Sequence, residues 1–254
     1  MGYIEVVERT TTRARIADVA EEQWGLVTRR QLELAHIPAT TVERIVAPGG
    51  TLERVARGVY RLAGTPTPDH IELRAAWLQL APGVEARERL PADGVVSHRS
   101  AASLYGIGHL PADRHEFIVQ HRKQSRRPDV RLHRRSLDAA GWIRLSGLPV
   151  TRPSRIASDL LYDHEDPEAV AQIVADALRR VSDYPGTFVE ALAPHAARFG
   201  LRRDDGLALL RWLLDLVGDD DTTRWMELAR ASMPRHQAQK APAAAVSHPA
   251  APHR

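Results

Sequence analysis

Arginine and threonine side chains recur between residues 29 and 61 of the 254-residue chain, at spacings that suit contact with nucleic acid. A guanidinium group binds phosphate oxygens or the edge of guanine through paired N–H donors, and a threonine hydroxyl can bond to a base or a phosphate. We therefore predict a surface that contacts double-stranded DNA. Its residues are Arg29, Arg30, Thr40, Thr41, Arg44, Arg54, Arg57 and Arg61.

Short helices should position the first five of these residues. Ile16, Val19, Ala20 and Trp24 recur at three- and four-residue steps, which predicts the buried face of a helix that ends at Gly25.

Two capping signals predict the helices that follow. Thr28 precedes Gln31 by three residues, and Thr40 precedes Glu43 by the same spacing. In this arrangement each pair can bond to free backbone N–H groups at a helix start. The second of these helices should present Thr41 and Arg44 to solvent, while its valine and isoleucine side chains turn inward.

A β-hairpin is expected next. Residues 52–55 and 59–62 read as two short strands, and the turn between them places Arg57 at the tip. Paired helices followed by a hairpin are typical of a winged helix-turn-helix, whose second paired helix enters the major groove. The residues around Thr40 would then read bases, and the arginines beside them would meet phosphates or the minor groove.

The length of 254 residues and the 43% of hydrophobic residues predict two domains with a sizeable core. The expected helices and strands predict the α+β class. We expect the winged helix-turn-helix at residues 1–64 and a mixed α/β domain with a helical C-terminal layer at 69–230. Residues 231–254, rich in alanine, proline and histidine, should form a flexible tail. A linker at 65–68 should end at Asp69, which we expect to cap the next helix.

Strands should come first in the second domain and helices last. The expected strands are residues 95–96, 116–119, 130–133 and 142–145, with a helix capped by Ser97 after the first strand. The expected helices of the C-terminal layer are residues 153–162, 167–181, 187–199 and 204–217.

Charge is unevenly distributed along the chain. Residues 95–160 contain 12 arginines and lysines against 5 acids, whereas residues 161–230 contain 8 against 14. The basic run predicts a second nucleic-acid surface, although a solvated hairpin is the alternative. This second basic surface comprises Arg122, Lys123, Arg126, Arg127, Arg131, Arg134 and Arg135.

The sequence lacks several features that secreted and membrane proteins usually have. There is no cysteine, which excludes disulfides and cysteine-based zinc fingers. No apolar run is long enough for a signal peptide or a membrane span. We expect a soluble cytoplasmic protein with no membrane partner.

The sequence lacks the residue patterns of common catalytic and metal-binding sites. Lys123 lies among arginines and lacks the strand-borne carboxylate pair of a magnesium-dependent nuclease. Residues 163–166 read as an acidic turn between helices, and His98 reads as a packed or hydrogen-bonded histidine. We predict no catalytic residue, no metal ligand, no cofactor and no enzymatic activity.

Three blocks of sequence resemble the AbiEi antitoxin family. The first joins Trp24-Gly25-Leu26-Val27-Thr28-Arg29-Arg30-Gln31-Leu32 to Leu52-Glu53-Arg54-Val55-Ala56-Arg57-Gly58-Val59-Tyr60-Arg61-Leu62. The others are residues 96–107 and 147–160, so the resemblance extends over roughly residues 15–200.

This resemblance implies an autorepressor that recognises repeats in its own promoter. It also implies an antitoxin of the type IV arrangement, which neutralises a nucleotidyltransferase-like toxin without necessarily binding it. Two alternatives stay open: a stand-alone transcriptional regulator without a toxin, and a nuclease-like protein targeted by its winged helix.

Overall fold

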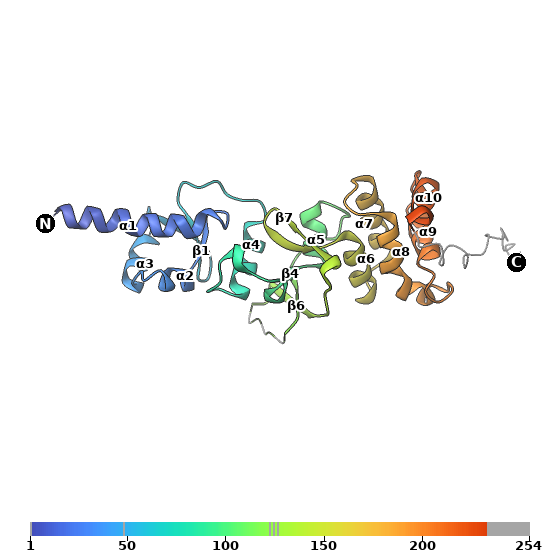
Figure 1. Ribbon diagram of the computed structural model, residues 1–254, viewed down its shortest axis with the longest axis horizontal. Coiled ribbons are helices and arrows are strands. Elements are labelled where there is room, and N and C mark those ends of the chain that lie inside the picture. The colour runs from blue at the N-terminus through green and yellow to red at the C-terminus, as the bar shows by residue number, and fades with distance from the viewer. Residues whose placement is uncertain (1, 48, 122, 124, 126, 233–254) are drawn as a thin grey trace, which may run out of the picture.

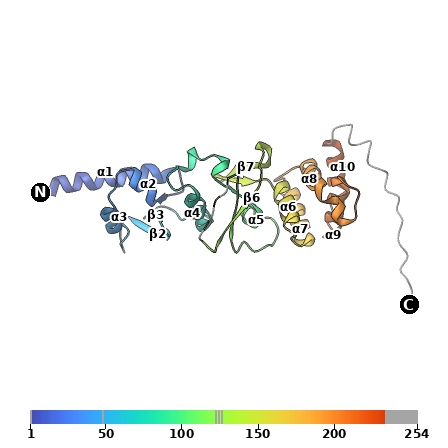
Figure 2. The ribbon, with the colours of Figure 1, turned by 90° about the horizontal axis from the view of Figure 1, so that it is seen from below.

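The protein is built as three parts in a row along its long axis, as the computed structural model in Figure 1 shows. A group of helices with a small sheet lies at the N-terminal end, a larger sheet lies in the middle, and a helical part lies at the far end. The view in Figure 2 shows the same order. The structure describes residues 2–47, 49–121, 123, 125 and 127–232.

Three helices and a three-stranded antiparallel sheet form the N-terminal part. They are α1 (Gly2–Glu21), β1 (Leu26–Thr28), α2 (Arg29–Leu34), α3 (Ala39–Ile45), β2 (Leu52–Ala56) and β3 (Val59–Leu62). The strand order is β1-β3-β2. The hairpin of β2 and β3 is confirmed, and β1 adds a third strand that the sequence prediction missed.

The first helix ends earlier than predicted. α1 stops at Glu21, and Trp24 follows with a φ of 62°, so its indole does not lie on the helix face. Instead, its Nε1–H donates to the backbone oxygen of Ser146, 3.0 Å away. The prediction for Trp24 is therefore wrong, because the backbone turns at Gly25, with a φ of 75°, to begin β1.

One predicted capping box is confirmed and the other is wrong. At the start of α2, the Gln31 N–H donates to the Thr28 hydroxyl at 3.1 Å, and the Thr28 N–H donates to the Gln31 side chain at 2.9 Å. α3 begins directly after Pro38 without a side-chain cap, which places Thr40 inside the first turn. Thr40 is exposed there rather than used as a cap.

The small sheet has two buried faces. Val27 and Tyr60 face α1–α3 and share a cluster of buried residues with Val42. Leu26 and Val59, their neighbours along the strands, belong to a second cluster that continues into the rest of the protein. Alternate residues of a strand point to opposite faces, so the sheet is packed between two layers.

Helix α4 (Ile71–Leu80) lies on the second face of this sheet and is buried along most of its length. Its Trp77 donates a hydrogen bond to the Gly94 oxygen at 2.8 Å. The predicted cap by Asp69 is wrong, because the helix follows His70 and has no side-chain cap.

Two buried arginines connect α4 with its surroundings. The Arg74 guanidinium lies 4.3 Å from the centre of the Trp24 ring, and Arg89 lies 4.3 Å from that of Trp77. Arg74 also donates to the backbone oxygens of Ser146 and Asp69, both at 2.9 Å. Burial lowers the pKa of Arg89 to about 10. These contacts tie the N-terminal part to the middle of the protein.

A mixed five-stranded sheet forms the middle part, in the order β6-β5-β4-β8-β7. Its strands are β4 (Val95–Val96), β5 (His115–Val119), β6 (Val130–Arg134), β7 (Trp142–Leu145) and β8 (Leu148–Thr151). Strand β4 pairs antiparallel with β5 and parallel with β8, while β5 pairs parallel with β6. The four predicted strands are confirmed, and β8 was missed.

Helix α5 (His98–Tyr105) packs against β5 and β8. It begins after Ser97, as predicted, but the Ser97 side chain does not cap it. The hydroxyl lies 2.9 Å from Nδ1 of His98 instead.

The C-terminal part is helical, as predicted. Its helices are α6 (Pro153–Tyr162), α7 (Pro167–Arg179), α8 (Pro185–Leu192), α9 (Gly206–Leu216) and α10 (Thr222–Ser232). The helix predicted at 187–199 is interrupted, because a 3-10 segment, Ala193–Phe199, follows α8. Other 3-10 turns are Ala86–Glu88, Pro91–Asp93 and Ala139–Gly141. Helix α10 was not predicted.

The predicted tail lies almost entirely outside the described residues, and α10 includes its first two positions. Among the helices that the structure describes, none combines the length and the apolar character needed to cross a membrane.

Replacing Arg74 with alanine should lower the free energy of unfolding by on the order of 2 kcal/mol, because a buried cation–π contact and two hydrogen bonds are lost. Urea unfolding monitored by circular dichroism measures this. Arg87→Ala is the matched control, since Arg87 is exposed and makes only surface ion pairs. Equal stability of the Arg74 variant and the control would contradict the proposed role of this contact.

Candidate nucleic-acid interface

Helices α2 and α3 form the helix-turn-helix. The turn between them is fixed by a hydrogen bond of 3.0 Å from the Ile37 N–H to the Leu32 oxygen, and the Ile37 side chain is buried. Val42 points inward from α3. The opposite side of α3 therefore faces solvent.

Two of the predicted base readers lie on this outer side of α3. Thr40 and Arg44 are exposed, whereas Thr41, which was expected to face solvent, is half-buried. Residues four apart on a helix lie on the same face, so Thr40 and Arg44 are neighbours. Glu43 is also exposed on α3, which leaves the outer side of this helix without a net positive charge.

Two exposed arginines open α2, as predicted. Arg29 and Arg30 lie 3.5 and 3.1 Å from the carboxylate of Glu33. All three side chains are largely exposed, and such surface ion pairs contribute only about 0–1 kcal/mol. A phosphate group can therefore replace Glu33 at little cost.

Arg54 lies on β2, two residues after the buried Leu52 and opposite Tyr60 on β3. It is exposed, and by the alternation of the strand it points to the face that α1–α3 cover. Arg54 is thus on the same side of the small sheet as the helix-turn-helix.

Arg61 points to the opposite face and is engaged within the protein. Its guanidinium pairs with Glu53 and donates to the Thr65 oxygen at 2.6 Å and to the Thr67 hydroxyl at 2.8 Å. Only 17% of the side chain is exposed. We therefore withdraw Arg61 from the DNA-contacting set.

Arg57 is at the tip of the hairpin, as expected, and is exposed. The turn itself is docked on two helices: Gln79 of α4 donates to the Arg57 oxygen, and the Arg29 N–H donates to the Gly58 oxygen at 2.8 Å. Gly58 has a φ of 73°, which a residue without a Cβ adopts freely. The tip is held in place while the Arg57 side chain stays accessible.

Three members of the second basic surface pair with acidic residues. Arg127 pairs with Asp129 and donates to the side chain of Gln79. Arg131 and Arg135 lie 3.3 and 2.5 Å from Asp163.

The remaining members of that surface do not restore a single positive patch. Arg135 also stacks on Tyr162, with 3.9 Å between its guanidinium carbon and the ring centre. Lys123 and Arg134 are exposed, while Arg122 and Arg126 lie outside the described residues. Because Asp129 and Asp163 pair with these arginines, the described part of this surface is less positive than its sequence suggests, and the second nucleic-acid surface stays a prediction.

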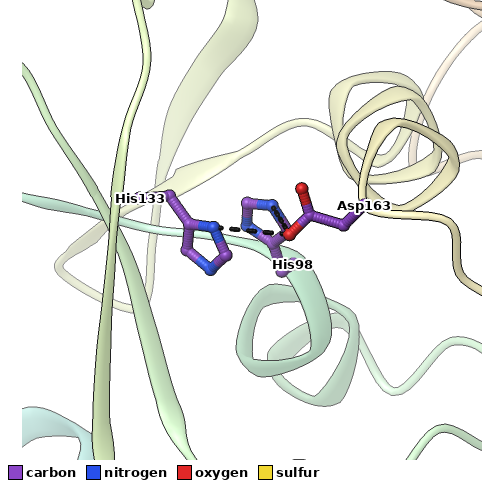
Figure 3. A group of neighbouring side chains, drawn as sticks. All are labelled: His98, His133 and Asp163. Carbon is purple, nitrogen blue, oxygen red and sulfur yellow. Dashed lines mark ion pairs between the residues drawn. The ribbon is translucent and has the colours of Figure 1, made fainter.

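A buried cluster of two histidines and a carboxylate lies at the junction of the five-stranded sheet and the helical part (Figure 3). His98 opens α5, His133 lies on β6, and Asp163 follows α6. The imidazole rings are stacked, with 3.6 Å between centres and 12° between planes. Asp163 Oδ2 lies 3.7 Å from His98 Nε2 and 3.5 Å from His133 Nδ1.

The other nitrogen of each imidazole has its own partner. His133 Nε2 lies 2.6 Å from Oε2 of Glu116 on β5, and His98 Nδ1 faces the Ser97 hydroxyl. His98 is 1% exposed, and its Nε2 has no hydrogen-bond partner among the described residues. Burial, with a smaller contribution from the positive charge of neighbouring arginines such as Arg135, lowers the pKa of His98 to about 2. His98 is therefore neutral at physiological pH.

An open cavity of about 210 Å³ lies beside this cluster, lined by His98, Arg99, Glu116, Arg131, Leu160, Asp163, His164 and Glu165. The sequence reading of His98 as a buried, hydrogen-bonded histidine agrees with its position. Its proximity to His133 and Asp163 was missed. No local signal could reveal it, because the three residues come together only through the packing of α5, β6 and α6.

A winged helix-turn-helix is defined by the paired helices and the hairpin behind them. Its exposed polar side chains include Thr40, Arg44 and Arg54. Residues 14–63 match a protein family described as "Transcriptional regulator, AbiEi antitoxin". The resemblance to this family is thus confirmed over the winged-helix segment. That segment belongs to the kind found in transcriptional regulators. Residues 96–107 and 147–160 lie outside that match. A search of curated proteins gave no match to the chain.

Arg61→Ala should lower the free energy of unfolding by about 1–3 kcal/mol, since two hydrogen bonds and an ion pair to Glu53 are removed. Chemical unfolding of the full chain measures the effect. Arg54→Ala, on the same hairpin but exposed, should change stability by no more than about 0.5 kcal/mol. The assignment of Arg61 to an internal role would be wrong if both variants were as stable as the unaltered protein.

Proposed function

We propose that the protein is a DNA-binding transcriptional autorepressor that acts as the antitoxin of a type IV toxin-antitoxin system. The observation that carries this proposal is the exposed outer side of α3, with Thr40 and Arg44, inside a segment that matches a regulator family. In helix-turn-helix proteins, the corresponding helix lies in the major groove and reads base edges.

Base reading by α3 fits its mixed charge. Arg44 can donate a pair of hydrogen bonds to guanine, and the Thr40 hydroxyl can donate or accept. Glu43, which would be repelled by phosphates, can accept a hydrogen bond from the amino group of cytosine. A helix with these groups gains more binding free energy from contacts with base edges than from contacts with the DNA backbone.

Attraction to the duplex must then come from residues around α3. Arg29 and Arg30 lie on one side of it in the sequence, and Arg54 and Arg57 lie on the hairpin. All four are exposed. In this proposal they contact phosphates and fix the orientation of α3, while carrying no sequence preference of their own.

The finer parts of the proposal derive from the family resemblance. They are recognition of repeats in the protein's own promoter, and neutralisation of a nucleotidyltransferase-like toxin without obligatory contact. With them we propose a cytoplasmic, non-enzymatic protein with domains at residues 1–64 and 69–230. Co-expression with an adjacent toxin-like reading frame separates an antitoxin, which restores growth, from a stand-alone regulator, which does not.

Fluorescence anisotropy with a labelled duplex from the region upstream of the gene tests DNA binding. We expect binding to this duplex to be at least about a thousandfold tighter than to a scrambled duplex at the same salt concentration. Equal affinity for the two duplexes would contradict a sequence-specific repressor.

Arg44→Ala should weaken binding to the upstream duplex by about 1–3 kcal/mol and relax the preference at one base position. The measurement is anisotropy against a set of duplexes that each carry one substituted base pair. Arg211→Ala is the control, because Arg211 is exposed and its helix, α9, lies at the other end of the protein from α3 (Figure 1). If Arg44→Ala weakened specific and scrambled duplexes equally, Arg44 would be a phosphate contact and not a base reader.

Arg54→Ala and Arg57→Ala should each reduce the salt dependence of binding. Every phosphate contact that is lost lowers the slope of log affinity against log salt by about 0.9. Anisotropy titrations at several salt concentrations measure this slope, and Arg211→Ala, with its exposed side chain on α9, serves as the control. A slope that stays the same in both variants would remove the hairpin from the interface.

A further inference from the structure

We propose that His98, His133 and Asp163 form a binding site for a divalent transition-metal ion such as Zn²⁺ or Co²⁺. Figure 3 shows all three side chains converging from separate elements, with both histidines directed at Asp163. Their ligand atoms lie within 4.8 Å of one another. This site goes beyond the proposed function and does not depend on it.

The distances within the group match those of a metal coordination sphere. Two donors that each lie about 2.1 Å from a tetrahedral ion are separated by about 3.4 Å. Asp163 Oδ2 is 3.7 Å from His98 Nε2 and 3.5 Å from His133 Nδ1. Both separations are longer than a hydrogen bond and close to the spacing of two ligands around one ion.

The outer partners of the histidines suit metal binding as well. A metal-binding histidine usually donates its second ring N–H to a carboxylate, a carbonyl or a similar acceptor, which fixes its tautomer. His133 Nε2 has Glu116 as such a partner at 2.6 Å, and His98 Nδ1 has the Ser97 hydroxyl at 2.9 Å. With their protons on these nitrogens, the rings direct the lone pairs of His98 Nε2 and His133 Nδ1 toward Asp163.

An ion would also satisfy a buried atom that has no partner. Within the part of the chain that the structure describes, His98 Nε2 makes no hydrogen bond, although the residue is 1% exposed. A buried polar atom without a partner is costly and uncommon in folded proteins. A lone pair that faces a carboxylate oxygen is also repelled by it, and a cation between the two atoms removes both costs.

The donor set indicates the class of ion. Two imidazole nitrogens and one carboxylate suit zinc, cobalt, nickel or iron, whereas calcium and magnesium prefer oxygen ligands alone. The adjoining cavity of about 210 Å³ leaves room for water as a further ligand.

Two neighbouring groups must adjust when an ion binds. The stacked rings need to rotate apart so that His98 Nε2 and His133 Nδ1 converge on a single point. Arg131, 53% exposed and 3.3 Å from Asp163 Oδ2, must turn toward solvent. Arg135 can stay, because it contacts the other oxygen, Oδ1. The bound ion would then connect the start of α5, the strand β6 and the end of α6.

The test uses the full chain in which His236, His248 and His253 are replaced by glutamine, so that histidines near the C-terminus do not bind metal. After treatment with a chelator and dialysis, the protein is titrated with Zn²⁺ by calorimetry and with Co²⁺ by visible absorption. We expect one ion per chain and a Co²⁺ spectrum with nitrogen and oxygen ligands.

Asp163→Asn should abolish this binding, and Glu116→Gln, which alters only the outer partner of His133, should weaken it about 10- to 100-fold. His115→Gln is the matched control, since His115 lies on β5 outside the group. This variant should bind the metal ion with unchanged affinity. Circular dichroism establishes that each variant is folded.

The proposal is overturned if the unaltered site binds no ion in the stoichiometric titration, or if Asp163→Asn binds as tightly as the parent. DNA affinity is measured in a separate experiment. A failure of the metal proposal can therefore be distinguished from a failure of the proposed DNA-binding function.

Discussion

The small sheet β1-β3-β2 is the constraint on which the rest of the structure depends. Its strands bury apolar side chains on both faces, with Val27 and Tyr60 against α1–α3 and Leu26 and Val59 toward α4. A strand that is buried on both sides cannot rotate or shift its register without exposing one of these sets. The orientation of the helix-turn-helix relative to the middle of the protein is therefore set by this sheet.

The same sheet decides which arginines can contact a ligand. Arg54 and Arg61 lie on paired strands but point to opposite faces, so one is exposed beside the helix-turn-helix and the other is bound to Glu53 and the following linker. The basic stretch near residue 130 shows the same principle, because Asp163 and Asp129 pair with its arginines. A count of basic residues thus overstates the positive surface of this protein.

Local patterns predicted local structure well. The pairing of Thr28 with Gln31, the hairpin around Arg57 and the strand at residues 115–119 depend on neighbours in the sequence, and each is present. Three other local signals failed, because Thr40, Asp69 and Ser97 do not cap the helices beside them. Further predictions failed where a distant segment decides the outcome. Trp24 left its expected helix to bond with Ser146, and β1 formed because β3 offers it a free edge.

The candidate sites divide in the same way. The exposure of Arg44 could be predicted because it depends on the spacing within one helix, whereas Thr40 was expected as a cap and Thr41 as exposed. Arg61 could not be assigned, since its partners depend on the strand face and on the fold of the linker. The group of His98, His133 and Asp163 could not be predicted from the sequence for the same reason, because it forms only when three elements pack together.

The central claim is that α3 lies in the major groove while the hairpin contacts the flank, and affinity cleavage tests it most directly. The sequence contains no cysteine, so Thr41→Cys and Arg57→Cys each create a unique attachment point for an iron chelate that cuts nearby DNA. The account predicts cuts within the protected operator from position 41, cuts toward its edge from position 57, and none from a control at Arg211→Cys. Indistinguishable cleavage from all three positions, or none from position 41 on a bound duplex, would contradict it.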